Sequence, residues 1–280
     1  MKKGLVLEGG GVRGIYTAGV LDVFMENGIE FDGVIGVSAG AVHGCSYLSR
    51  QKGRSIRYYE KYVNDPRFMG FKSYIKTGDI VGVDFCYHEL PDKLDPYDHK
   101  SFLENKSEFY SVCTDLESGE ARYFKITDMK EQIDMLRASA SLPYFSRPVP
   151  INGKLYLDGG CSDSIPIRAF REMGFEKNTV VLTQPMGYVK KPELSVLPNI
   201  FYKKYPRFAQ TLRERHNFYN ETLQKLSEME KEGSVFIIRP REPLGIGRLE
   251  KDAKEVRRVY DIGRSDAERL LKDLKKWLDK

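Results

Sequence analysis

The amino-acid sequence predicts an α/β protein with a mostly parallel central sheet and helices on both faces. In the first half of the chain, short apolar runs alternate with segments in which apolar residues recur at helical spacing. Glycine-rich turns follow two of these runs and precede the helical segments. This alternation is typical of parallel strands, because the connection between two of them needs room for a covering helix.

The first helix is predicted over residues 14–27, where Val20 and Phe24 stand four positions apart. Gly28 then fits a helix C-cap. A second helix is expected at residues 39–50. The strand signals are apolar runs bounded by turn residues, and they predict about seven strands, at 5–8, 31–37, 109–114, 121–126, 154–157, 179–183 and 235–239.

The last third of the chain departs from this rhythm. Residues 186–208 are rich in Pro, Lys and Tyr, and residues 209–232 are charged with a helical pattern. Residues 261–280 predict an amphipathic helix whose apolar side carries Ile262, Leu270, Leu271, Leu274 and Leu278. The 280 residues are enough for a large buried core. We expect a single domain over residues 1–280, with a core at about 4–185 and an extension at 186–280.

Composition excludes several classes of protein. The net charge is +5, from 45 basic and 40 acidic residues, which does not indicate a nucleic-acid binder. No stretch approaches the ~20 apolar residues of a membrane span. Glu8 interrupts the first apolar run too early for a secretory signal. Free thiols are expected for the scattered cysteines, and with them a cytoplasmic location. These cysteines are Cys45, Cys86, Cys113 and Cys161.

A serine stands where an exposed nucleophile is expected. Gly36-Val37-Ser38-Ala39-Gly40 matches G-x-S-x-G between an apolar strand and a helix. A serine on such a sharp turn has an exposed hydroxyl, and the N-terminus of the helix adds partial positive charge beside it. The alternative is a glycine-rich turn with an ordinary N-cap serine.

A nucleophilic serine needs a base. His43 lies five residues further along the same helix and is expected to point away from the turn. His88 and His99 fall in a polar loop region, and His216 lies in a charged helical stretch typical of a solvated surface. Asp158 ends an apolar strand before Gly159 and Gly160, so its carboxylate can reach the sheet edge that carries Ser38. The alternative is a simple Asp-Gly turn.

The first glycine-rich loop has two interpretations. Gly9, Gly11 and Gly14 have the spacing of the dinucleotide fingerprint of a Rossmann fold. That fold places the ribose-binding acid at the C-terminal end of the second strand, whereas Asp32 lies at its start. The same convergence of main-chain N–H groups would suit the oxyanion of an ester under attack.

Three motifs together resemble the patatin-like phospholipase family, in its order. They are Gly9-Gly10-Gly11-Val12-Arg13-Gly14, Gly36-Val37-Ser38-Ala39-Gly40 and Asp158-Gly159-Gly160. The segments 137–143 and 163–166 also look like that family, and the resemblance covers about residues 4–185. It implies a three-layer sandwich, a Ser38–Asp158 dyad and an oxyanion hole. That hole would comprise Gly9, Gly10, Gly11, Arg13 and Gly14, with Gly10 and Gly11 as donors.

The expected activity is hydrolysis of lipid acyl esters, phospholipid or neutral glyceride, without cofactor or metal. A transacylase with the same dyad and a non-catalytic lipid- or dinucleotide-binding protein stay as alternatives. No nucleic-acid partner is expected, and nothing in the sequence defines an oligomeric state. Residues 188–208 interleave aromatics with Lys190, Lys191, Lys203, Lys204 and Arg207, which predicts peripheral contact with an anionic membrane. The alternative is a solvated loop with inward-packed aromatics.

Overall fold

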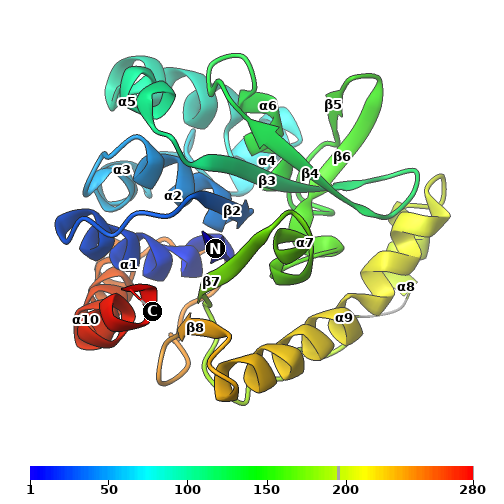
Figure 1. Ribbon diagram of the computed structural model, residues 1–280. Coiled ribbons are helices and arrows are strands. Elements are labelled where there is room, and N and C mark those ends of the chain that lie inside the picture. The colour runs from blue at the N-terminus through cyan, green and yellow to red at the C-terminus, as the bar shows by residue number, and fades with distance from the viewer. Residues whose placement is uncertain (194–195, 280) are drawn as a thin grey trace.

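The computed structural model describes residues 1–193 and 196–279 and builds them around one central sheet (Figure 1). Residues 194, 195 and 280, which belong to the predicted extension, lie outside the described part. The sheet has eight strands in the order β5-β6-β3-β2-β1-β7-β8, and β4 pairs with β3. The strands are β1 Lys2–Leu7, β2 Gly33–Val37, β3 Glu108–Asp115, β4 Ala121–Ile126, β5 Val149–Ile151, β6 Lys154–Asp158, β7 Phe175–Val181 and β8 Val235–Ile238.

The middle of the sheet is parallel and one end is antiparallel. β3, β2, β1, β7 and β8 pair as parallel neighbours, whereas β4 and β6 run antiparallel to β3 and β5 runs antiparallel to β6. The predicted mixed α/β fold with a mostly parallel sheet is therefore confirmed. All predicted strands are present, although the strand predicted at 179–183 begins earlier, at Phe175. The three-residue β5 has no counterpart among the predictions.

Helices cover both faces of the sheet (Figure 1). They are α1 Ile15–Glu26, α2 Ala39–Leu48, α3 Arg54–Tyr62, α4 Phe71–Thr77, the π-helix η2 Phe85–Leu94, α5 His99–Glu104, α6 Ile133–Ser139, α7 Ile167–Glu172, α8 Val196–Phe201, α9 Pro206–Lys231 and α10 Ala253–Asp279. Two short 3-10 turns, η1 Gly11–Gly14 and η3 Gly159–Cys161, follow β1 and β6.

Alternate residues of the strands face opposite layers. Leu5 and Leu7 of β1 pack into the core formed with α1, α2 and α10, while Val6 packs with Phe170 of α7 and Tyr219 of α9. This two-residue alternation is what a strand buried on both faces requires. The result is a three-layer arrangement in which the turns after β1, β2 and β7 meet at one edge.

The C-terminal helix lies directly on the first helix. A Cβ atom at Gly263 of α10 would lie 2.0 Å from the carbonyl oxygen of Tyr16, and one at Gly19 of α1 would lie 2.1 Å from that of Tyr260. Two glycines thus allow backbone-to-backbone contact between α1 and α10. Buried hydrogen bonds flank the contact, because the Tyr260 hydroxyl donates to Asp22 and the Tyr16 hydroxyl donates to Asp266.

The extension is more regular than its sequence suggests. The helix predicted at 209–232 begins at Pro206, and the helix predicted at 261–280 begins at Ala253. β8 adds an edge strand beside β7. All four cysteines are free, as predicted.

Candidate functional site

Ser38 occupies a strained turn between β2 and α2. Its backbone has φ 54° and ψ −125°, which a side-chain-bearing residue rarely adopts and which costs roughly 1–3 kcal/mol. The turn also needs glycine at position 40, because a Cβ there would lie 2.5 Å from the carbonyl oxygen of Leu7. A Cβ at Gly36 would lie 2.5 Å from Ala41. Gly36 thus lets β2 and α2 pass closely, as the motif predicts, and Gly40 lets α2 approach the end of β1.

The sheet topology brings Asp158 to Ser38. β4 occupies one edge of β3, so β2 and β6 share the other edge. Val37 at the end of β2 pairs with Val112, and Asp158 at the end of β6 pairs with the next residue, Cys113. Because β2 is parallel and β6 antiparallel to β3, the two strands run toward each other and their C-terminal ends meet.

Both side chains of this pair are buried, with Ser38 exposed by 5% and Asp158 by 4%. Burial raises the pKa of the Asp158 carboxyl, while Arg215 and hydrogen bonds from the Ser38 hydroxyl and the Gly160 amide partly oppose the rise. The Gly160 amide donates to Oδ1 of Asp158 at 2.7 Å. A desolvated carboxylate of raised pKa is a better proton acceptor than an exposed one.

The C-terminal end of α6 and the residues that follow it support both members of the pair. The Ser38 amide donates to the Ser139 hydroxyl at 2.9 Å, and the Asp158 amide donates to the Ser141 carbonyl at 2.8 Å. Ser139 is fully buried. The resemblance pointed to residues 137–143, but no pattern in the sequence indicated that Ser139 would hold the strained turn.

The glycine-rich loop lies against Ser38. A Cβ at Gly9 would stand 3.1 Å from Cβ of Ser38, and Gly11 has a left-handed φ of 58°. Within residues 1–193 and 196–279, the amides of Gly10 and Gly11 donate no hydrogen bond to another residue, whereas the next amide, of Val12, donates to the Arg248 carbonyl. Two free N–H groups beside a serine hydroxyl are the donors that an oxyanion needs.

The predicted site residues separate into two groups. A small cavity of about 20 Å³, with room for about one water molecule, is lined by Gly9, Gly10, Gly11, Arg13, Ser38, Asp158 and Gly160. Gly14 and Gly159 lie outside it and serve packing instead. A Cβ at Gly14 would stand 2.6 Å from that of Ala39, and one at Gly159 would stand 2.1 Å from the Val112 carbonyl oxygen.

No histidine of the described chain bonds to Ser38 or Asp158. His43 is buried and pairs through Nδ1 with the Ser55 hydroxyl at 2.9 Å, and burial lowers its pKa to about 3. His216 is half-buried rather than fully solvated, and its Nδ1 contacts the Arg213 carbonyl. His88 is exposed on η2 and His99 is half-buried at the start of α5, so both lie in helices rather than in a loop, and both border an apolar cavity.

The dinucleotide interpretation finds no support at Asp32. Its carboxylate accepts the Lys3 amide at 2.6 Å, at the N-terminal end of β2. The glycine-rich loop follows the C-terminal end of β1, which is the opposite edge of the sheet.

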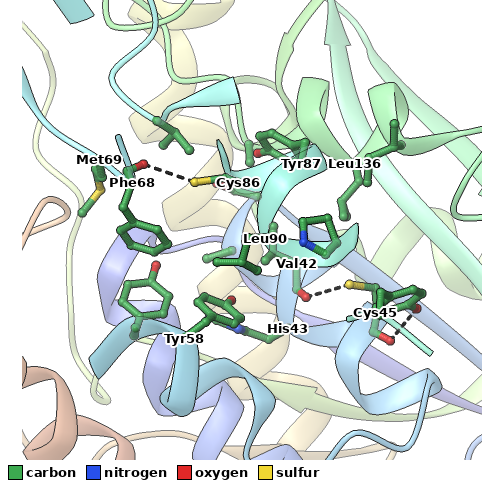
Figure 2. Close-up of a pocket in the computed structure, with 18 of the residues that line it drawn as sticks. Val42, His43, Cys45, Tyr58, Phe68, Met69, Cys86, Tyr87, Leu90 and Leu136 are labelled. Atoms are coloured by element: carbon green, nitrogen blue, oxygen red, sulfur yellow. Dashed lines mark hydrogen bonds between the residues drawn. The ribbon is translucent and has the colours of Figure 1, made fainter. Parts of the chain in front are cut away.

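An apolar cavity of about 370 Å³ opens beside Ser38 (Figure 2). Val42, Tyr58, Phe68, Met69 and Leu90 project into it from α2, α3, the segment before α4, and η2. Ser38 and Gly11 are among the residues that line it. No local pattern in the sequence indicated this cavity, because its wall comes from segments that are distant in the chain.

Four cations surround the other side of the pair. Arg13, Lys190, Arg215 and Arg248 line the small cavity that holds Ser38 and Asp158. The sequence analysis placed Lys190 on a membrane-facing surface, and this prediction is wrong. Lys190 is half-buried, with Nζ 4.3 Å from the centre of the Tyr219 ring, because the hydrogen bonds of its backbone to Asn220 turn the segment inward.

The fold is thus an α/β sandwich in which a strand-to-helix turn carries a serine beside a buried carboxylate at one edge of the sheet. A family model described as patatin-like phospholipase matches residues 5–171, and a second, described as a domain of unknown function, matches residues 205–279. The chain belongs to the patatin-like phospholipase family, which supports lipid hydrolase activity in general.

Similar proteins include the uncharacterized protein YjjU of Escherichia coli (strain K12), 26% identical over 93% of this chain and 74% of that protein. Lysophospholipase NTE1 of Cryptococcus neoformans var. neoformans serotype D is 28% identical over 64% of this chain, which spans only 11% of that protein. The crystal structure of VipD from Legionella pneumophila matches with a TM-score of 0.46 and 13% identity, over 97% of this chain and 67% of VipD.

No helix within residues 1–193 and 196–279 has the length and apolarity needed to cross a bilayer. The same residues contain no group of three or more His, Cys, Asp or Glu side chains arranged to hold a metal ion.

Proposed function

We propose that this protein is a serine acyl-ester hydrolase that acts on lipids through Ser38 and Asp158. The observation that carries the proposal is the meeting of β2 and β6, which sets a strained serine beside a buried carboxylate, with the serine also lining an apolar cavity. The amides of Gly10 and Gly11 supply the oxyanion hole.

The proposed reaction has two stages. Asp158 accepts the proton of the Ser38 hydroxyl while Oγ bonds to the ester carbonyl carbon, and the carbonyl oxygen becomes an anion between the two glycine amides. The carbonyl re-forms, the ester C–O bond breaks, and the leaving alcohol takes the proton from Asp158. Water then attacks the acyl-enzyme, giving its proton to Asp158 and its oxygen to the fatty acid, and Ser38 regains its proton.

The apolar cavity suits the acyl chain. Each CH₂ group transferred from water into such a cavity contributes about 0.8 kcal/mol, so a chain of several carbons would be held firmly. Since Ser38 lines the cavity, an acyl chain lying in it could bring its carbonyl carbon to the nucleophile.

Labelling with a fluorophosphonate probe, followed by peptide mapping, tests the proposal. Ser38→Ala should lose both labelling and hydrolysis of a short soluble ester, and Asp158→Asn should lose several orders of magnitude in rate, because an amide cannot accept the proton. Asp163→Asn is a control, since Asp163 is a half-buried aspartate whose pKa burial raises to about 6, but its carboxylate accepts from the Tyr123 hydroxyl. Full turnover by Ser38→Ala would overturn the proposal. Added acceptor alcohols would reveal transacylation.

We also propose that a surface around α4 and α8 contacts the lipid aggregate. Phe71, Phe145 and Phe201 are 69%, 45% and 59% exposed. A series of ring contacts through Tyr74 and Tyr144 joins them: Phe71 contacts Tyr74, whose ring meets Phe145 and whose hydroxyl donates to the Tyr144 carbonyl, and Tyr144 contacts Phe201. Exposed apolar groups that are contiguous mark interaction surfaces.

Only some of the basic and aromatic residues of the segment 188–208 support contact with a membrane. Lys203, Lys204 and Arg207 are exposed, whereas Tyr202 and Phe208 are buried, so the aromatics of residues 188–208 divide between surface and core. Phe71→Ser combined with Phe201→Ser should weaken binding to anionic vesicles and leave hydrolysis of a soluble ester unchanged. Leu103→Ser, at another exposed apolar position, is the control. Equal vesicle binding by all variants would reject this surface.

A further inference from the structure

We infer that Glu8 is a positioning residue, which together with Tyr219 of α9 holds the glycine-rich loop in the conformation that the proposed oxyanion hole needs. The inference rests on the proposed function, because it concerns how the donor amides of Gly10 and Gly11 are kept in place. It also gives a role to the segment 205–279, whose family model is described as a domain of unknown function.

Glu8 is a buried carboxylate at the start of the loop, directly after β1. Its Oε2 accepts the amide and the hydroxyl of Thr183, at 2.5 and 3.0 Å, and its Oε1 accepts the Tyr219 hydroxyl at 2.5 Å. The Glu8 amide donates to the Val181 carbonyl at 3.1 Å. These bonds tie the start of the loop both to the end of β7 and to α9.

The hydrogen bonds of Glu8 suit a holding role rather than that of a second base. Glu8 lines the same small cavity as Ser38 and Asp158, but in the described part of the chain none of its hydrogen bonds reaches either residue. Three donors converge on its two oxygens, which is the pattern that an ionised carboxylate accepts. Burial raises the pKa of Glu8, whereas these hydrogen bonds and the charge of Lys190 oppose the rise.

Two contacts from the segment 205–279 hold the loop at its two ends. At the first end, the Tyr219 hydroxyl bonds to Glu8. At the other end, the Arg248 carbonyl accepts the Val12 amide at 3.0 Å. The two proposed donor amides lie between these points, so their positions depend on both contacts.

Close packing couples Glu8 to the donors and to the serine turn. A Cβ at Gly10 would stand 3.0 Å from Oγ1 of Thr183, the hydroxyl that donates to Glu8. A Cβ at Gly40, two residues after Ser38, would stand 2.8 Å from the Glu8 carbonyl oxygen. A shift of Glu8 would therefore move the donor amides relative to the serine hydroxyl. Loss of one oxyanion donor typically lowers kcat by about 100- to 1000-fold.

Tyr219 is itself held in place by its surroundings. Its ring meets the Tyr188 ring edge-on, with centres 6.0 Å apart, and Nζ of Lys190 lies 4.3 Å from its centre. A side chain that packing fixes in this way can position the group to which it bonds. The Tyr219 hydroxyl therefore transmits the position of α9 to Glu8.

Steady-state rates on a short soluble ester test the inference, together with binding of a trifluoromethyl ketone that has the same acyl group. The ketone adds to the Ser38 hydroxyl and leaves an oxyanion in the proposed hole. Glu8→Gln keeps the shape of the side chain but replaces one acceptor oxygen by a donor. It should lower kcat by roughly 10- to 1000-fold and change KM less than about twofold. Affinity for the ketone should fall with kcat, because both depend on the oxyanion.

Tyr219→Phe is the milder variant, because it leaves Thr183 bound to Glu8. It should lower kcat by roughly 3- to 30-fold, part of the effect of a hydrogen bond to a charged group. The double variant should be no slower than Glu8→Gln alone, since Tyr219 acts through Glu8. Tyr260→Phe is the matched control, because it removes an equally buried bond from a tyrosine to a carboxylate, that of Asp22, away from the loop. Its kcat should stay within about twofold of the wild type.

The outcomes separate this inference from the proposed function. If the wild type cleaves the ester and Glu8→Gln keeps its kcat, or if the two single losses add in the double variant, positioning through Glu8 is wrong and the hydrolase stands. If Glu8→Gln does not fold, the comparison of Tyr219→Phe with Tyr260→Phe decides, and an equal kcat of the two rejects the inference.

If the wild type cleaves no ester, hydrogen exchange of the peptide 5–14 decides. The amide of Val12, bonded to Arg248, reports whether the loop keeps its conformation. Its exchange should be roughly tenfold faster in Tyr219→Phe than in the wild type, and unchanged in Tyr260→Phe. Equal exchange in all three proteins would reject the holding role of Tyr219.

Discussion

Replacing Gly263 by alanine gives the sharpest test of how α10 is held on α1. Helix propensity alone predicts that Gly263→Ala stabilises the protein by about 1 kcal/mol, since glycine is a poor residue inside a helix. The packing predicts the opposite sign. The new Cβ would stand 2.0 Å from the Tyr16 carbonyl oxygen, a backbone atom that cannot rotate away.

The expected cost follows from what must move. α1 and α10 would have to separate by about an ångström to reach an ordinary contact distance, which strains the hydrogen bonds of Tyr260 and Tyr16 and the ion pair of Arg264 with Glu26. Overpacking of this kind costs about 1–3 kcal/mol, and in chains of this size that lowers the melting temperature by roughly 2–12 °C.

Thermal unfolding followed by calorimetry measures the effect. Ser265→Ala, two residues further along α10 at an exposed position, keeps the helix-propensity change but meets no backbone, so its melting temperature should rise slightly or stay the same. A Gly263→Ala protein that melts at or above the wild-type temperature would refute the backbone contact between the two helices.

Three further outcomes follow from the site and the core. Because burial raises the pKa of Asp158 and only its ionised form accepts the proton, the rate on a short neutral ester should rise with pH through a midpoint above the usual aspartate range, and a midpoint at or below that range would contradict this role. Ser139→Ala leaves the buried amide of Ser38 without its acceptor, a loss of about 1–3 kcal/mol. If this free energy is lost from the conformation of the Ser38 turn, kcat should drop roughly 5- to 150-fold with little change in KM. An unchanged kcat would show that the turn keeps its conformation without Ser139. Tyr260→Phe removes a donor that lowers the pKa of Asp22, so denaturant unfolding should show its cost at neutral pH and less cost as acid protonates Asp22. An equal loss of unfolding free energy at neutral and at acidic pH would exclude a hydrogen bond from Tyr260 to the ionised Asp22 carboxylate.

The strands and the serine turn could be predicted because their signals are local. Apolar runs and two-residue alternation define β1, β2 and β3, and the glycines around Ser38 are needed by the turn itself. Asp158 was expected at the same sheet edge as Ser38. The two residues meet because β2 and β6 run toward each other along β3, and no local motif encodes that pairing.

The apolar cavity and the four cations beside Ser38 and Asp158 could not be predicted, because distant segments form both. The short helices α3 and α4 and the π-helix η2 lack a long apolar repeat, so residues 54–94 gave no helix signal. Arg215 belongs to a charged stretch that resembles a solvated helix face, and only the packing of α9 beside the turn after β6 shows that it points inward. Lys190 was misplaced for the same reason, since its contact with Tyr219 joins residues 29 positions apart.

The separation of the site along the chain has a consequence for how this protein could diverge. The groups proposed to make and break bonds lie between Gly10 and Asp158, whereas three of the four cations that line the same cavity, Lys190, Arg215 and Arg248, come later in the chain. Substitutions in the later segment can therefore change the polar surroundings of the site while the groups proposed for the reaction stay intact. Lipid preference could then evolve independently of the reaction chemistry. Exchanging residues 186–279 between relatives that share Tyr219 would be the direct way to transfer the lipid preference without the reaction chemistry.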